Sequence, residues 1–230
     1  MKRRVFFAAS MLAIGLLVPT YGVASTITIT LAPGDDDAHV YSNSPTGNYG
    51  ANPGFVVTKA FDGNGQLTSE RQAYLKFSLS ALGGYSAADI TSVKLGLYVY
   101  TTGASTVTAY HTTDNWDEGT ITWGNKPAIG GEMGTSPAMT TNNSYYLTDL
   151  LAGGPGWLGG DLTDGYLSVA LRITSDVGPS SSYYFHSTET NPALAQYPYL
   201  QVQVVPEPAA IGMVLLGGIL LLPRFGRRNG

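Results

Sequence analysis

The chain has 230 residues, no cysteine and a formal net charge of −4. Without cysteine there are no disulfides and no thiol chemistry. Setting aside the two ends described below, residues 25–205 hold six basic and fifteen acidic side chains, a formal charge of −9. Such an acidic surface lacks the basic stripe that nucleic acids and anionic lipids require, so we expect no nucleic-acid partner.

The first residues predict a secretory signal peptide. Three basic residues at 2–4 precede an apolar stretch from 5 to 18, and the small residues Gly22 and Ala24 offer a cleavage site after Ala24. We therefore assign residues 1–24 to export. A retained membrane anchor is the alternative.

Residues 25–205 read as a single all-β domain, because short segments of alternating apolar and polar residues are separated by Gly, Pro, Asn and Asp. A helix signal is confined to Leu147–Leu158, where Thr148 or Asp149 can cap one turn. This pattern favours a jelly-roll-like β-sandwich over a parallel α/β sheet. The predicted strands are Thr26–Leu31, Ala38–Ser42, Phe55–Lys59, Arg71–Ser78, Thr91–Tyr100, Thr106–Thr112, Tyr166–Thr174, Tyr183–Ser187 and Tyr199–Val205.

Five segments of the domain resemble a known family of secreted modules. They are DAHVYSNSPTGNYG (37–50), RQAYLKFSLSAL (71–82), ITSVKLGLYVY (90–100), WDEGTITWGNKP (116–127) and YYFHSTETNPALAQYPYLQV (183–202). In order and spacing they are similar to DNRLRE-type domains, which are classed among carbohydrate-binding modules, although the hexapeptide that names that family is absent. The resemblance implies a polysaccharide-binding β-sandwich. Modules of this family accompany polysaccharide lyases, and some of the modules bind acidic glycans such as alginate.

Five residues are candidates for glycan contact. Alternation places Tyr74 and Lys76 on the polar face of one strand and Lys94 and Tyr98 on that of another, and Tyr110 can extend the same surface. Aromatic rings stack on the apolar side of a pyranose, and lysines bind its hydroxyls or carboxylates. The alternative is that these residues are ordinary cross-strand pairs on a solvated face.

The three tryptophans are expected to be structural. Trp116 and Trp123 flank a Gly-Thr-Ile-Thr segment, which favours burial in a hairpin over a role as sugar platforms. Trp157 follows a glycine-rich loop and is expected to pack under it.

Carboxylates suggest a calcium site. Asp35 and Asp37 lie just before a predicted strand, and Glu189 lies near the end of the domain. The first and last strands of a jelly roll run side by side, so these acids can converge on calcium, which prefers oxygen ligands. A second acidic cluster lies within 114–118. Solvated turn carboxylates are the alternative, and the three scattered histidines do not fit zinc.

The end of the chain resembles a bacterial sorting signal. A Pro-Glu-Pro box precedes 14 apolar residues (209–222) and three arginines, an order similar to the PEP-CTERM signal of Gram-negative bacteria, which implies processing by an exosortase. A helix of this length rises only ~21 Å, less than the ~30 Å hydrocarbon core, which fits a transient anchor for residues 206–230. An ordinary single anchor is the alternative. The sorting motif is Val205, Pro206, Glu207 and Pro208.

No nucleophile elbow, P-loop or HExxH motif occurs in the chain. We predict a non-enzymatic protein that is exported through the inner membrane of a Gram-negative bacterium and binds extracellular polysaccharide at the cell surface or in the matrix. One alternative is a structural matrix or adhesion scaffold without a glycan site. The other is a polysaccharide lyase, because such enzymes can work with Tyr, His, Lys and Arg alone. Acidic and neutral glycans both remain open.

Overall fold

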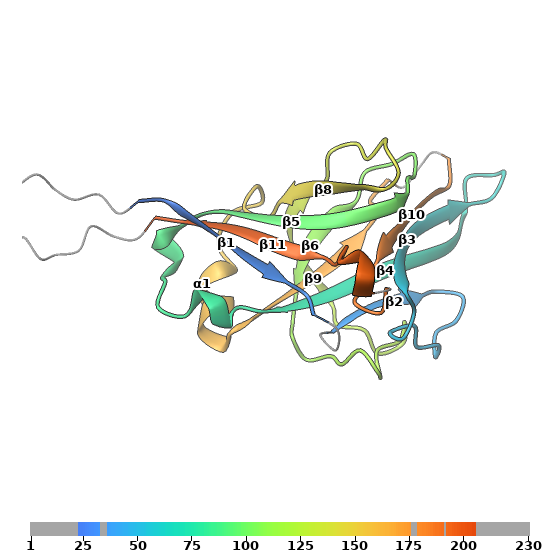
Figure 1. Ribbon diagram of the computed structural model, residues 1–230. Coiled ribbons are helices and arrows are strands. Elements are labelled where there is room, and N and C mark those ends of the chain that lie inside the picture. Colours follow the sequence, from blue (N-terminus) through green and yellow to red (C-terminus); the bar gives the residue numbers. More distant parts are fainter. Residues whose placement is uncertain (1–22, 33–35, 176–178, 191, 206–230) are drawn as a thin grey trace, which may run out of the picture. The chain divides into compact units, whose positions relative to one another are not determined.

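Antiparallel strands dominate the computed structural model (Figure 1), which describes residues 23–32, 36–175, 179–190 and 192–205. Within these ranges one α-helix, α1 (Leu158–Asp164), and three short 3-10 turns (Ser80–Leu82, Ala87–Asp89 and Pro192–Leu194) accompany the strands. The strands are β1 (Ser25–Thr30), β2 (Asp37–Tyr41), β3 (Gly54–Phe61), β4 (Leu67–Ser78), β5 (Ile90–Thr101), β6 (Thr108–Thr112), β7 (Ile129–Thr135), β8 (Ser144–Asp149), β9 (Tyr166–Arg172), β10 (Ser181–His186) and β11 (Tyr199–Val204).

The predicted all-β fold is confirmed, and each of the nine predicted strands corresponds to an observed one. Two strands, β7 and β8, were not predicted. The sequence of β7 contains three glycines, which weaken the strand signal. The helix expected over Leu147–Leu158 is wrong, because its first three residues belong to β8 and α1 begins only at Leu158.

The strands form one continuous, curled sheet that separates into two layers at β3. One layer holds β1, β11, β5, β10 and β8, and the other holds β2, β4, β9, β6 and β7. β3 pairs with β10 over Gly54–Lys59 but with β4 only over Thr58–Phe61. β2 pairs with β4 from Arg71 onward, so the two layers diverge beyond that point.

The core lies between these layers and contains the apolar residues that alternation assigns to it. In β4 these are Ala73, Leu75 and Phe77, and in β5 they are Val93, Leu95, Leu97 and Val99, all in one buried cluster. A smaller buried cluster lies on the opposite side of β4, where Trp116 and Ile121 cover Tyr74. The loop between β6 and β7 therefore covers one outer face, whereas the outer face of the β5 layer keeps large side chains exposed.

Ala24–Val205 forms one compact unit. Residues 1–22, with most of the expected signal peptide, and 206–230, with the expected sorting segment, lie outside the described residues. Among the residues that are described, no helix has the length and apolar character needed to cross a membrane.

Candidate functional site

A row of aromatic side chains crosses the outer face of the β5 layer. We call it the aromatic strip and define it as Tyr98, Tyr100, Tyr145, Tyr184, His186 and Tyr199. Its ring centroids lie 5.2 Å apart for Tyr199–Tyr145, 5.2 Å for Tyr145–Tyr98, 4.8 Å for Tyr98–His186, 5.3 Å for His186–Tyr100 and 5.6 Å for Tyr100–Tyr184. Tyr100 and Tyr145 are 38% and 39% exposed, so the strip presents ring surface to solvent.

Strand register explains why these rings meet. Tyr98 of β5 stands opposite Tyr145 of β8, and Tyr199 of β11 stands opposite Gly96. A Cβ atom at Gly96 would lie 2.4 Å from the Tyr199 ring, so the glycine leaves the space that this ring occupies. Aromatic cross-strand pairs of this kind fix each other's orientation and leave a rigid surface.

At one end the strip continues into a cleft with a volume of about 400 Å³. Tyr100, Tyr184 and His186 form one wall of the cleft, and His39 and Arg71 belong to the opposite layer. The volume lies in the range of small-molecule sites, ~300–1,000 Å³. Strip and cleft together form an elongated surface that is aromatic along its length and polar at one end.

His39, one of the two histidines in this cleft, is held neutral. His39 stacks on Tyr49 with ring centroids 4.8 Å apart and planes inclined by 17°. Burial, followed by the nearby Arg71 charge, lowers the pKa of His39 to about 4. The guanidinium of Arg71 lies over the ring of Tyr41, 4.2 Å from its centroid. Arginine is thus the group in this cleft that carries positive charge at neutral pH and can bind sugar hydroxyls or carboxylates.

The five predicted glycan-contact residues do not form one surface, and that prediction is wrong. Lys94 and Tyr98 lie on the outer face of the β5 layer, and Tyr98 is part of the strip. Tyr74 is fully buried, in edge contact with Trp116 at 5.9 Å. Lys76 donates to the Trp116 carbonyl at 2.6 Å and pairs with Asp36 at 2.6 Å.

Tyr110 lies in the same layer as Tyr74, because both residues pair with Ala170 of β9, one from β6 and the other from β4. It is half-buried against the smaller cluster, and burial raises its pKa. Alternation along a strand assigns a residue to a face, but it does not show whether a distant loop covers that face. Here the β6–β7 loop covers Tyr74, and Lys76 holds the loop by donating to the Trp116 carbonyl.

Replacing Tyr74 with alanine is therefore expected to destabilise the fold rather than to remove a sugar contact. The ring is fully buried, and its hydroxyl donates to Gln72 Oε1 at 3.2 Å. We expect a loss of ~3–5 kcal/mol in the free energy of unfolding for Tyr74→Ala and about 1 kcal/mol for Tyr74→Phe. Urea denaturation followed by circular dichroism measures both values, and equal, small losses would contradict the buried position.

The tryptophans are placed largely as expected. Trp116 is buried and donates from Nε1 to Ser168 Oγ at 3.1 Å. Trp123 is half-buried against the smaller cluster, with Lys126 Nζ 4.6 Å from its ring centroid. Trp157 is half-buried and packs against the main core.

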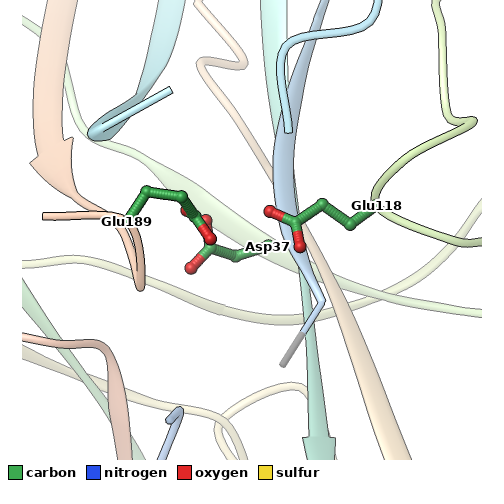
Figure 2. A group of neighbouring side chains, drawn as sticks. All are labelled: Asp37, Glu118 and Glu189. Atoms are coloured by element: carbon green, nitrogen blue, oxygen red, sulfur yellow. The ribbon is translucent and has the colours of Figure 1, made fainter. Parts of the chain in front are cut away.

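Three carboxylates from distant parts of the chain converge in what we call the acidic triad, Asp37, Glu118 and Glu189 (Figure 2). One carboxylate oxygen of each lies within 4.8 Å of the others. Asp37 begins β2, Glu118 lies in the β6–β7 loop, and Glu189 follows β10. The structure thus brings together Asp37 and Glu189 of the predicted set, while Asp35 lies outside the described residues. Glu118 comes from the second acidic cluster in the sequence.

Surrounding hydrogen bonds orient the triad. The Thr188 backbone N–H donates to Asp37 Oδ2 at 2.8 Å, and the Thr188 hydroxyl donates to Glu189 Oε1 at 2.8 Å. Burial, followed by the charges of Glu189 and Asp37, raises the pKa of Glu118 to about 8. Like charges this close favour uptake of a proton or of a cation. An all-oxygen donor set suits a hard cation such as calcium.

The antiparallel sandwich thus presents a row of aromatic rings beside a cleft, a surface on which a ring-containing ligand can stack. Residues 28–203 match carbohydrate-binding module family 96, and the chain belongs to this family. It is also 27% identical over 210 residues to a gellan lyase from Bacillus sp., an alignment that covers 90% of this chain. The chain spans only 8% of the length of that lyase. The narrower DNRLRE-type assignment stays a prediction.

Proposed function

We propose that the protein binds an extracellular polysaccharide without cleaving it, and that the aromatic strip and its cleft form the binding surface. The observation that carries this proposal is the unbroken series of six rings on one outer face, each 4.8–5.6 Å from the next. Successive pyranose rings of an extended chain stack on such a row through their C–H faces. Membership of a carbohydrate-binding module family supports the same assignment.

Stacking along the strip orients the chain, and the polar end of the cleft holds it. Arg71 there donates to hydroxyl or carboxylate oxygens. Lys94 lies on the same outer face, since it alternates in β5 with Gly96 and Tyr98. Each contact is weak, and many copies of the protein on one surface raise the overall avidity.

Calcium in the acidic triad is the second part of the proposal. An ion held by Asp37, Glu118 and Glu189 ties the start of β2 to the β6–β7 loop and to the segment after β10. The same segment leads back to His186 of the strip, three residues before Glu189. Calcium would therefore stabilise the fold and fix one end of the binding surface.

For localisation, we propose export and display at the cell surface or in the extracellular matrix of a Gram-negative bacterium. This rests on the sequence of the two ends, with residues 1–24 as the signal peptide and the Pro206-Glu207-Pro208 box as a substrate for an exosortase. The apolar stretch that follows would act as a transient membrane anchor.

A lyase is the second candidate function. The cleft contains Tyr49, His39 and Arg71, residue types that can abstract a proton and stabilise a developing negative charge. The similarity to a gellan lyase points the same way, although it concerns a small part of that enzyme.

Affinity electrophoresis of the purified full-length protein through gels containing acidic or neutral polysaccharides tests the proposal. The absorbance of unsaturated products is followed in parallel solutions. We expect retarded migration in at least one polysaccharide with no product. Product formation would establish the lyase, and unretarded migration of folded protein in every gel would favour a matrix scaffold.

A further inference from the structure

A second concave site lies at the opposite end of the sandwich from the cleft. It has a volume of about 430 Å³ and is lined by Trp157, His111, Glu132 and the backbone of four glycines. The loop that carries it begins at Leu150, whose N–H donates to the Val93 carbonyl near the start of β5. Tyr100 of the aromatic strip lies seven residues further along β5, a rise of ~23 Å. The two sites are therefore separate.

The walls of this pocket are held in place before any ligand arrives. Trp157 packs against the main core and lies nearly parallel to His111, with ring centroids 6.3 Å apart and planes inclined by 22°. The Nε2 atom of His111 lies 3.0 Å from Oδ1 of Asp161, a side chain in α1 that is 5% exposed. A site whose walls are fixed by packing loses less conformational entropy on binding.

Glycines keep the pocket open. A Cβ atom at Gly131 or Gly156 would meet nothing within 4 Å, so side chains at these positions would extend into free space. Gly153 differs, because a Cβ there would lie 2.1 Å from the Glu132 carbonyl. Packing therefore explains Gly153 but not Gly131 or Gly156, whose lack of side chains leaves room for a ligand.

The chemistry of the walls identifies the class of ligand. The pocket offers the flat surface of Trp157, and its other lining residues are His111, Glu132 and four glycines. A pyranose matches this arrangement, since it has an apolar C–H face and a rim of hydroxyls.

The charge around the pocket selects against an acidic sugar. Glu132 is in the wall, and Asp161 lies directly behind His111. Burial is the main cause that raises the pKa of Asp161 to about 6, and the negative charges of Asp114 and Asp164 add to it. A ligand carboxylate would enter the same negative field and be repelled.

We propose that the Trp157 pocket binds one neutral hexopyranose residue, independently of the aromatic strip. The domain then has two points of attachment, the aromatic strip with its cleft and the Trp157 pocket, which share no residue. Two separate points allow one domain to hold two polysaccharide chains or two distant parts of one chain.

The test follows the indole N–H resonance of Trp157 by NMR while D-glucose, D-galactose or D-mannose is added to the full-length protein at millimolar concentrations, with D-glucuronate as the charged comparison. We expect at least one neutral sugar to shift this resonance and D-glucuronate not to shift it. Gly131→Leu fills the pocket and should weaken the response at least about tenfold. Gly156→Leu fills the pocket from the loop side. This variant is used instead of Gly131→Leu if the substitution in β7 disturbs the fold.

Two controls separate this inference from the proposed function. Gly160→Leu places the same side chain on α1, where a Cβ also meets nothing within 4 Å, and should leave the response unchanged. Tyr100→Ala disrupts the aromatic strip and should also leave it unchanged. No shift with any of the neutral sugars, or an equal shift in both pocket-filling variants, would overturn the second site whatever the strip binds.

Discussion

Replacing Tyr100 and Tyr184 together with alanine is expected to weaken polysaccharide binding at least about tenfold, because a well-placed tyrosine at the centre of an interface contributes 1–2 kcal/mol or more. Both rings lie at the junction of the strip and the cleft, and their centroids are 5.6 Å apart. Neither belongs to the buried core, so the free energy of unfolding should change little. Affinity electrophoresis measures the loss, and circular dichroism checks the fold.

Two further variants make this prediction specific. Tyr100→Phe and Tyr184→Phe keep the stacking surfaces and should retain most of the affinity. Tyr166→Ala removes a tyrosine that is 47% exposed at the start of β9, on the other layer, and should bind like the wild type. Equal losses for Tyr166→Ala and the double alanine variant would mean that the strip is not the binding surface.

Removing divalent cations is expected to lower the melting temperature at pH 8 by at least ~5 °C, and calcium should restore it. A ligand present at a hundred times its dissociation constant stabilises by ~2.7 kcal/mol, and one kcal/mol corresponds to ~2–4 °C for a domain of this size. Glu118→Gln removes one of the three triad charges. In chelator this variant should melt higher than the wild type, and added calcium should raise its melting temperature far less.

The effect should depend on pH in a defined direction. Without an ion, the folded state keeps a proton on Glu118 up to about pH 8, whereas the unfolded chain releases it near the ordinary pKa of 4.5. Between these values the unfolded state binds fewer protons, so the free energy of unfolding falls as the pH rises. The groups that face Glu118 are Glu189, Asp37 and Asp36, with Lys76 paired to Asp36. The stabilisation by calcium should therefore grow from pH 5 to pH 8.

Differential scanning fluorimetry at several pH values, with calcium or chelator, measures these effects. Glu132→Gln is the matched control, since it removes one carboxylate that does not belong to the triad. The calcium site would be contradicted by a melting temperature at pH 8 that is the same in calcium and in chelator. A calcium response that survives in Glu118→Gln would place the ion elsewhere.

The fold could be predicted from the sequence where period-2 alternation is strong. In β4 and β5 the apolar residues point to the core as expected, because a strand with one buried face must alternate. β7 was missed because its glycines remove the side chains on which that signal depends. β8 was missed because Leu147, Leu150 and Leu151 suggest a helical spacing, while in the structure Leu147 is an exposed strand residue.

The candidate site was less predictable, since it depends on which strands become neighbours. Tyr98 was identified from its own strand. Tyr145, Tyr184 and Tyr199 join it only because β8, β10 and β11 all pair with β5. For the acidic triad, the sequence showed two acidic clusters but not that the β6–β7 loop brings Glu118 to Asp37. The signal that could have revealed the strip was Tyr98-Val99-Tyr100, two tyrosines alternating with a core valine.

The most direct test of the proposed function is an NMR chemical-shift map of the full-length protein with a soluble oligosaccharide of whichever polysaccharide retards it in gels. The proposal predicts that the largest shifts lie at Tyr98, Tyr100, Tyr184 and His186, with no cleavage of the oligosaccharide. Shifts confined to the covered face of the β4 layer, or no shifts at saturating oligosaccharide, would contradict binding at the aromatic strip.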